Sequence, residues 1–201
     1  MAAERLGLYG GTYSPPHRGH IHSLMAFLEA EKPDRTLIMP NAVPPHKTMR
    51  RDETPEIRLE MCRAAFDSFE NVEISSYETD KGGFSYTADT LEYLTKPGRE
   101  ILMLVGSDMF RTLRRWRSPD KIFALATVCC VARYGHESEE LEEVAASYRR
   151  ECGANVRIIP TDVIEISSTE IRERIAKGLP LHDLIPSAVE TIIRRENLYR
   201  D

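Results

Sequence analysis

The 201-residue sequence lacks the features that mark several common classes of protein. It has no run of about 18 or more apolar residues, which excludes a membrane-spanning helix, and its first residues predict no secretory signal. It also lacks a basic excess: 27 Lys and Arg stand against 32 Asp and Glu, for a net charge of −5. Nucleic-acid-binding domains usually carry a clear basic excess. We therefore expect a soluble, cytoplasmic protein that binds neither nucleic acid nor a membrane.

Cysteine is scarce and shows no metal-binding or redox spacing. Among Cys62, Cys129, Cys130 and Cys152 there is no C-x-x-C pair, and no Cys/His spacing resembles a zinc site. Because neighbouring strand residues point to opposite faces, Cys129 and Cys130 are expected on opposite sides of a sheet. We predict four reduced thiols that act as small hydrophobic side chains, as in cytosolic proteins.

Short apolar runs alternate with longer amphipathic segments along the whole chain. The runs are continuously apolar, which predicts strands buried on both faces, and their alternation with helices predicts a parallel sheet. The predicted strands cover residues 6–9, 36–39, 72–74, 101–105, 128–132 and 156–159. The predicted helices cover residues 19–31, 55–69, 87–94, 139–151, 168–177 and 186–197.

These elements predict an α/β fold with one doubly wound parallel sheet. We expect a single domain over residues 1–201, with a carboxyl-terminal helical portion from about residue 166. On the first helix, Ile21, Leu24, Met25 and Leu28 are predicted to share the buried face. The acidic run at residues 137–143 predicts the solvated face of a helix. In such sheets ligands bind beyond the carboxyl ends of the strands.

The loop after the first predicted strand, residues 10–20, has the sequence GGTYSPPHRGH. Its two glycines allow a ligand to approach the backbone, and the helix start beyond them offers unpaired N–H groups to an anion. His17 and His20 are three residues apart, so they project to the same side and can donate to phosphate oxygens. The spacing matches neither the G-x-G-x-x-G motif nor a P-loop. A structural turn with two surface histidines is the alternative.

A second motif, ISSTEIR, covers residues 166–172 near the other end of the chain. Ser168 is predicted to cap a helix start. Arg172 lies three residues past Thr169 on the same face, where it can hold a phosphate. An ordinary capping sequence on a surface helix would have the same pattern.

Together, the two motifs resemble those of the HxGH nucleotidyltransferase superfamily, which includes adenylyl- and cytidylyltransferases. Within it the chain is most similar to the bacterial nicotinate-nucleotide adenylyltransferases. Further matching stretches are PPHK at residues 44–47, SYTADTL at 85–91 and GSD at 106–108, followed by Trp116 and Arg133. The resemblance covers nearly the whole chain. One position departs from it: Ser14 stands where the family usually has Asp, or sometimes Asn. A serine can still cap the turn through its hydroxyl, but it cannot supply a negative charge.

The resemblance implies a Rossmann-like fold and adenylyl transfer from ATP to nicotinate mononucleotide, giving deamido-NAD and pyrophosphate in NAD biosynthesis. The attacking phosphate is already anionic, so the reaction needs positioning and charge stabilisation rather than a general base. Mg²⁺ is expected on the ATP phosphates, with no metal ligand from the protein. The implied catalytic residues are His17, His20, Lys47 and Arg172. The implied ATP-binding residues are Gly10, Gly11, Thr12, Tyr13, His17, His20, Gly106, Asp108, Ser167, Ser168, Thr169 and Arg172.

The implied mononucleotide-binding residues are Lys47, Tyr86, Thr87, Trp116 and Arg133. Trp116 is the only tryptophan and lies among arginines, which favours stacking on a pyridine ring over a purely structural role. No Asp or Glu occurs between residues 109 and 119 to accept a hydrogen bond from an amide, and the arginines there make the potential positive. Both features favour nicotinate over nicotinamide.

Two other functions are left open. A related transferase acting on nicotinamide mononucleotide or on phosphopantetheine would share the fold, although phosphopantetheine enzymes resemble T-x-G-H, so His17 argues against them. A nucleotide-binding regulator that has lost the chemistry would be expected to lose a histidine or the arginine, and this chain has His17, His20, Lys47 and Arg172. The expected partners are the small-molecule substrates; a homo-oligomer is left open.

Overall fold

The apolar runs form the strands of a parallel sheet. The computed structural model describes the chain except residues 1–2, 46–51, 133–135, 163, 165 and 201. The sheet has six strands in the order β3-β2-β1-β4-β5-β6. The strands are β1 (Glu4–Gly11), β2 (Arg35–Pro40), β3 (Val72–Ile74), β4 (Arg99–Gly106), β5 (Thr127–Ala132) and β6 (Val156–Pro160). This is the doubly wound order, so the predicted fold class is confirmed.

The predicted helices are all present, and four further short helical segments accompany them. The helices that match predictions are α1 (Arg18–Glu31), α2 (Pro55–Phe66), α4 (Thr87–Leu94), α7 (His136–Cys152), α8 (Ser168–Ala176) and α9 (Ser187–Arg195). The segments that the sequence analysis missed are α3 (Tyr77–Lys81), α5 (Ser107–Thr112), the 3₁₀ helix η1 (Leu113–Arg115) and α6 (Pro119–Leu125). They are at most seven residues long, too short for helical periodicity to be visible.

The chain folds as two compact units, each built from separate stretches of sequence. Unit 1 comprises Met1–Gly10, Ser23–Leu37 and Tyr86–Val163. Unit 2 comprises Gly11–His22, Ile38–Ser85 and Ile164–Asp201. Each is described by itself below, and the expectation of a single domain stays a prediction.

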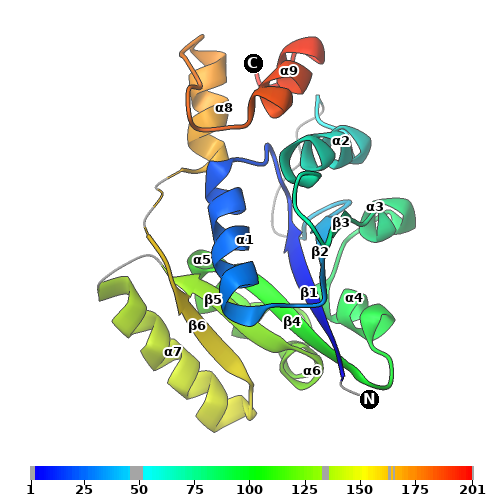
Figure 1. Cartoon of the computed structure of the whole chain (residues 1–201), viewed down its shortest axis with the longest axis vertical. Helices are drawn as coiled ribbons and strands as arrows, with labels where there is room; N and C mark the ends of the chain where they lie inside the picture. The colour runs from blue at the N-terminus through cyan, green and yellow to red at the C-terminus, as the bar shows by residue number, and fades with distance from the viewer. Residues whose placement is uncertain (1–2, 46–51, 133–135, 163, 165, 201) are drawn as a thin grey trace. The chain divides into compact units, whose positions relative to one another are not determined.

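Unit 1 is built around β4, β5 and β6. Strand β5 pairs in parallel with β4 on one side and with β6 on the other, and β4 also pairs in parallel with β1. Every residue of β5 is buried, and Cys129 and Cys130 are both 0% exposed although they point to opposite faces. This sheet is therefore covered on both sides, as predicted. Helix α7 packs against β6 (Figure 1), and the Tyr148 hydroxyl donates to the Phe110 carbonyl at 2.8 Å, which ties α7 to α5.

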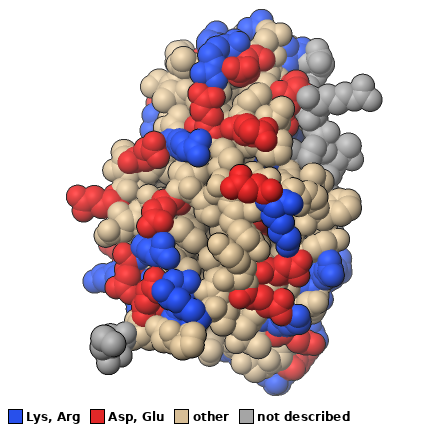
Figure 2. Space-filling model, turned by 90° about the vertical axis from the view of Figure 1, so that its right-hand side faces the viewer, with Lys and Arg blue, Asp and Glu red and all other residues tan. Residues whose placement is uncertain are grey.

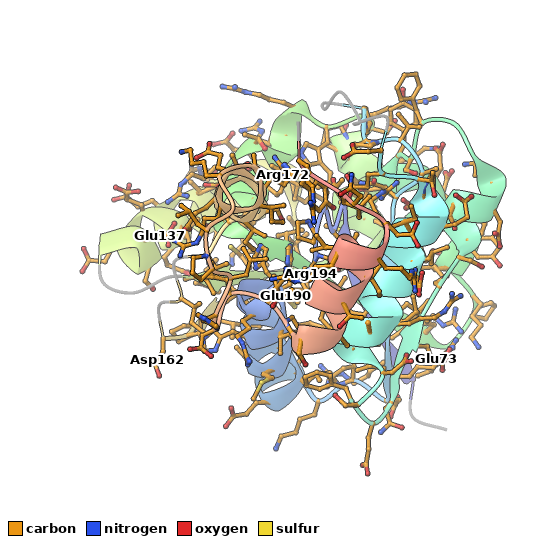
Figure 3. The ribbon with its side chains drawn as sticks, turned by 90° about the horizontal axis from the view of Figure 1, so that it is seen from above. Glu73, Glu137, Asp162, Arg172, Glu190 and Arg194 are labelled. Carbon is orange, nitrogen blue, oxygen red and sulfur yellow. The ribbon has the colours of Figure 1, made fainter. Side chains whose placement is uncertain are left out.

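Unit 2 contains the packed pair α2 and α9 (Figure 1). Helix α9 buries Val189, Ile192 and Ile193 on one face. Its outer side carries the Glu190–Arg194 ion pair, one turn apart, which Figure 3 labels. The Arg195 guanidinium donates to both carboxylate oxygens of Glu60 on α2, at 2.9 and 2.6 Å.

The predicted buried face of α1 was wrong at one position. Leu24, Phe27 and Glu31 are buried, whereas Met25 is 53% exposed. Residues spaced by three and four share a helical face, and Met25 lies about 100° away from the stripe that Leu24 and Phe27 define. Glu31 is accommodated on this face because Arg5 and Arg157, both in unit 1, each donate to its carboxylate.

Charges of both signs are mixed on the surface drawn in Figure 2, where blue and red side chains alternate rather than gather into one patch. Within the described parts of the chain, the structure has no helix that is both long and apolar enough to cross a membrane.

Candidate functional site

The two histidines of the first motif cap the start of α1 reciprocally. The His17 Nδ1 accepts from the His20 backbone N–H at 3.3 Å, and the His20 Nδ1 accepts from the His17 backbone N–H at 3.2 Å. This is the geometry of a capping box, with imidazole nitrogens in the place of a hydroxyl and a carboxylate. Because each Nδ1 accepts, a neutral ring carries its proton on Nε2, so the partners assign Nε2 as the donor atom.

The two imidazole rings lie against each other, as the three-residue spacing predicted. Their centroids are 3.7 Å apart, and the ring of Tyr13 packs 5.1 Å from that of His20. Tyr13 is 1% exposed and also packs edge-on against Phe66, so the His20 ring packs against a buried aromatic side chain. A Cβ added at Gly19 would meet the His17 ring at 3.0 Å, so any other residue there would require the ring to shift by a few tenths of an ångström. The close approach of the ring therefore favours glycine between the histidines.

The loop from Gly11 to Tyr13 is held by an arginine that the sequence analysis missed. Arg58 of α2 is 0% exposed and donates to the carbonyls of Thr12 and Ala42 at 2.9 and 2.7 Å. Burial lowers the pKa of Arg58, while the Glu53 carboxylate raises it. A guanidinium stays protonated even so, so a positive charge lies directly beneath the loop.

The second motif starts α8, but the capping residue is Ser167 rather than Ser168. The Ser167 hydroxyl accepts from the Glu170 N–H at 3.1 Å, and Ser167 has the extended backbone of an N-cap. The prediction that Ser168 caps the helix was therefore wrong by one residue. Ser168 is instead the first residue of α8, and its hydroxyl donates to the Pro15 carbonyl at 3.0 Å.

Arg172 links α8 to the loop of the first motif. One guanidinium nitrogen donates to the Ser14 carbonyl at 2.7 Å, and the other donates to the Thr169 hydroxyl at 3.1 Å. Figure 3 labels Arg172 on α8. Together with the Ser168 bond to Pro15, this contact brings the two motifs together in unit 2, although more than 150 residues separate them in sequence.

A buried carboxylate lies next to this junction. The Ser14 hydroxyl donates to Glu53 at 2.5 Å, and the Tyr199 hydroxyl donates to the other carboxylate oxygen at 2.6 Å. Burial raises the pKa of Glu53, and the two hydroxyls, Arg58 and Arg172 lower it by less. Burial and the neighbouring carboxylate raise the pKa of Tyr199, so its hydroxyl stays protonated and donates.

In unit 1, the predicted mononucleotide-binding residues that the structure describes, Tyr86, Thr87 and Trp116, lie near the start of α4. Tyr86 is the residue before α4, and the Arg117 guanidinium lies 4.2 Å from the centre of its ring. Trp116 directly precedes Arg117, is half-buried, and ends η1. Tyr86, Thr87 and Trp116 therefore belong to one region of unit 1.

The predicted positive potential around Trp116 is partly neutralised. Arg111 pairs with Glu137 at 3.2 Å and with Glu140 at 3.4 Å, and Arg114 pairs with Glu151 at 2.5 Å. The acidic run at residues 137–143 is therefore not only a solvated face, because α7 presents two of its carboxylates to Arg111. Such partly exposed pairs add little stability, but they offset the arginine charge locally.

Two predicted ATP-binding residues, Gly106 and Asp108, lie at the end of β4 and the start of α5. Gly106 precedes the short helix α5, and the Asp108 side chain is 85% exposed. A Cβ added at Gly106 would meet no heavy atom of the described chain within 4 Å. The surrounding protein therefore gives no steric reason for glycine there.

The predicted residues that the structure describes divide between the two units. In unit 2 they are Gly11, Thr12, Tyr13, His17, His20, Ser167, Ser168, Thr169 and Arg172. In unit 1 they are Gly10, Tyr86, Thr87, Gly106, Asp108 and Trp116. Lys47 and Arg133 lie outside the described residues. The sequence analysis missed Glu53, Arg58 and Tyr199, because no motif or spacing in the sequence marks them.

The strand order defines an α/β protein with a Rossmann-like, doubly wound parallel sheet. The chain belongs to the cytidylyltransferase-like family, whose model matches residues 8–174.

Similar sequences and similar solved structures each cover 98% of this chain. The chain is 34% identical over 200 residues to a probable nicotinate-nucleotide adenylyltransferase of Shouchella clausii, covering 98% of both chains. It is 31% identical over 198 residues to one of Clostridium botulinum, covering 98% of this chain and 99% of that one. Its fold is similar to that of Plasmodium falciparum nicotinic acid mononucleotide adenylyltransferase complexed with NaAD, with a TM-score of 0.77, 16% identity, and coverage of 98% and 97%.

Proposed function

We propose that this chain transfers the adenylyl group of ATP to nicotinate mononucleotide, forming deamido-NAD and releasing pyrophosphate. The observation that carries the proposal is the junction in unit 2, where the His17–His20 pair and the start of α8 share one loop. Full-length relatives named probable nicotinate-nucleotide adenylyltransferases support the choice of acceptor. The cysteines are free thiols, which suits the reducing cytosol, where we place the activity.

In this proposal, the unit 2 residues hold the triphosphate. The Nε2 atoms of His17 and His20 donate to oxygens around the α-phosphorus, where negative charge grows as the bond to pyrophosphate breaks. Ser168, Thr169 and Arg172 bind the outer phosphates at the start of α8, whose N–H groups favour an anion. Lys47 stays a predicted contributor to the same charge stabilisation.

The unit 1 residues hold the mononucleotide and the nucleoside. Trp116 stacks on the pyridine ring, and Tyr86 and Thr87 line it from the start of α4. Asp108 and Gly106, after β4, are proposed to contact the adenosine, with Asp108 accepting from a ribose hydroxyl. Arg133 stays a predicted partner of the mononucleotide phosphate.

The donors at the α1 and α8 starts are imidazoles, hydroxyls and a guanidinium, which suit phosphate oxygens rather than a cation. We therefore propose that Mg²⁺ is held by the ATP phosphates. It supplies charge neutralisation of the leaving pyrophosphate. The protein contributes alignment, which alone can lower a barrier by roughly 7–11 kcal/mol.

The test is pyrophosphate release from MgATP with nicotinate mononucleotide, nicotinamide mononucleotide or phosphopantetheine supplied separately. We expect turnover with nicotinate mononucleotide and a product with the mass of deamido-NAD. Turnover only with another acceptor would assign the chain to a different transferase of the family. ATP binding without turnover on any of the three would identify a nucleotide-binding regulator instead.

A further inference from the structure

Ser14 makes hydrogen bonds through both its side-chain hydroxyl and its backbone carbonyl. Its hydroxyl donates to Glu53 at 2.5 Å, and its carbonyl accepts from Arg172 at 2.7 Å. Two hydrogen bonds through Ser14 therefore connect the buried Glu53 carboxylate to the Arg172 guanidinium, which is proposed to bind the triphosphate. Ser14 itself offers only a hydroxyl, so the negative charge next to this junction comes from Glu53.

Both oxygens of the Glu53 carboxylate have protein partners. The second oxygen accepts from the Tyr199 hydroxyl at 2.6 Å, and the backbone N–H of Tyr199 donates to Asp52 at 2.9 Å. Glu53 is 3% exposed and Tyr199 is 1% exposed. The carboxylate is therefore fixed between the segment before α2 and the end of the chain, with little freedom to turn.

We propose that Glu53, in the segment before α2, is a positioning residue that orients the guanidinium of Arg172 by fixing Ser14. The inference rests on the proposed function for the substrate that Arg172 binds. Glu53 itself touches no substrate: it acts on Arg172 through the Ser14 carbonyl, and its negative charge also lies near the guanidinium.

A purely structural role would not need a charge at this place. Burying a carboxylate opposes folding, and well-packed neutral groups of similar volume often replace buried charges without loss of stability. Both oxygens of Glu53 accept hydrogen bonds, as those of an ionised carboxylate do, whereas burial raises its pKa, so ionisation of this group opposes folding. Costs of this kind are typical of functional positions.

The decisive experiment moves the carboxylate between the two positions. Glu53→Gln keeps the shape of the side chain and removes its charge. Ser14→Asp places a second carboxylate against Glu53. The double variant Ser14→Asp/Glu53→Gln again has one carboxylate, now on the other side of the same contact. Glu60→Gln is the matched control, because Glu60 lies in the same unit and pairs only with Arg195 among the bonds described. For each, ATP affinity is measured by calorimetry, KM for both substrates and kcat by pyrophosphate release, and stability by urea unfolding.

We expect Glu53→Gln to weaken ATP binding about tenfold or more, the scale of a lost charge-assisted contact, with little change in KM for the mononucleotide and no loss of unfolding free energy. Ser14→Asp should be impaired by repulsion between two adjacent carboxylates, and the double variant should recover to within about threefold of the parent. Glu60→Gln should behave as the parent does.

Parental ATP affinity in Glu53→Gln would overturn the inference. So would a double variant no better than the worse single variant, or an equal weakening of both substrates in step with lost stability. The proposed function fails separately, if the unchanged protein shows no adenylyl transfer. The calorimetric ATP series still tests the role of Glu53 in that case.

Discussion

At the residue scale, the two histidines of the first motif have an observed structural task and a proposed chemical one, which involve different atoms. Their Nδ1 atoms accept from backbone N–H groups and hold the start of α1, which leaves Nε2 as the donor of each neutral ring. A substitution can therefore separate the structural task from the chemical one.

His20→Ala should lower kcat about 10²- to 10³-fold, because it removes a preorganised donor. It should also cost about 1 kcal/mol of stability through the lost cap, which leaves the protein folded. His20→Asn is the matched comparison: its side-chain oxygen can accept from the His17 N–H, so it should restore stability but not turnover. Steady-state kinetics and urea unfolding measure the two effects, and a kcat for His20→Ala within about threefold of the parent would contradict the assignment.

Arg172→Lys should weaken ATP binding while leaving mononucleotide affinity nearly unchanged. The lysine keeps the charge but cannot donate to Ser14 and Thr169 at once as the planar fork does. Calorimetric titration of each substrate checks this. Equal weakening of both would contradict a role confined to the triphosphate.

Residue-scale chemistry could be predicted from the sequence only where the partners are close along the chain. The pairing of His17 with His20 follows from their spacing in a first helical turn. Glu53, Arg58 and Tyr199 were missed because they contact the loop across up to about 185 positions of sequence, and no periodicity encodes such contacts. Ser168 was assigned as the cap because a serine on either side of a helix start satisfies the same rule.

At the scale of the elements, Glu4 joins the amino ends of three strands. Its carboxylate pairs with Arg99 of β4 at 2.9 Å and Arg35 of β2 at 3.2 Å, and with Lys96 at 2.8 Å. Lys96 foremost, then Arg99 and Arg35, lower the pKa of Glu4 from 4.5 to about 2. Because the folded pKa is depressed, the contribution to stability is present above pH 4.5 and is lost as the pH falls toward 2.

Glu4→Gln should therefore lower the urea midpoint near neutral pH, and the difference from the parent should shrink as the pH falls through this window. Added salt should also reduce the difference, because the group is open to solvent. Urea titrations at several pH values measure it. A difference that is independent of pH would show that the ion pairs contribute nothing.

The strands were the most predictable elements and the short helices the least. The runs Ile101–Val105 and Val128–Ala132 are buried throughout, so continuous apolarity was a sufficient signal. The segment from Ser107 to Leu125 contains three short helical pieces broken by Ser118 with positive φ, and its sequence shows arginines rather than a periodic stripe. Its course is decided by tertiary contacts such as that of Arg117 with Tyr86.

At the scale of the whole molecule, the proposed roles divide between the two units: the triphosphate contacts lie mainly in unit 2 and the pyridine contacts in unit 1. Trp116→Ala should therefore raise KM for the mononucleotide far more than KM for ATP, because stacking acts on one substrate only. Comparable increases in both would contradict this division.

The same region should select the acid over the amide. Residues 109–119 carry no carboxylate of their own to accept from an amide. The α7 carboxylates that reach this segment already pair with Arg111 and Arg114, so we expect nicotinamide to leave its N–H groups unpaired. We expect kcat/KM for nicotinate mononucleotide to exceed that for nicotinamide mononucleotide by at least about 10², since unpaired buried donors give strong discrimination. Equal efficiency with the two would indicate dual specificity.

The cysteines give each unit an internal probe of its own opening. Burial raises the pKa of Cys129 and Cys130 to about 12, and it raises the pKa of Cys62 still further, so almost no thiolate is present near neutral pH. Alkylation of these thiols must await exposure by local or global opening. Cys62 belongs to unit 2 and the adjacent pair to unit 1, so mass spectrometry of timed alkylation shows whether the units open together. Equal rates that track the global unfolding free energy would show that the molecule opens as one cooperative whole. Faster labelling at Cys62 would show that unit 2 opens while the strands of unit 1 stay closed.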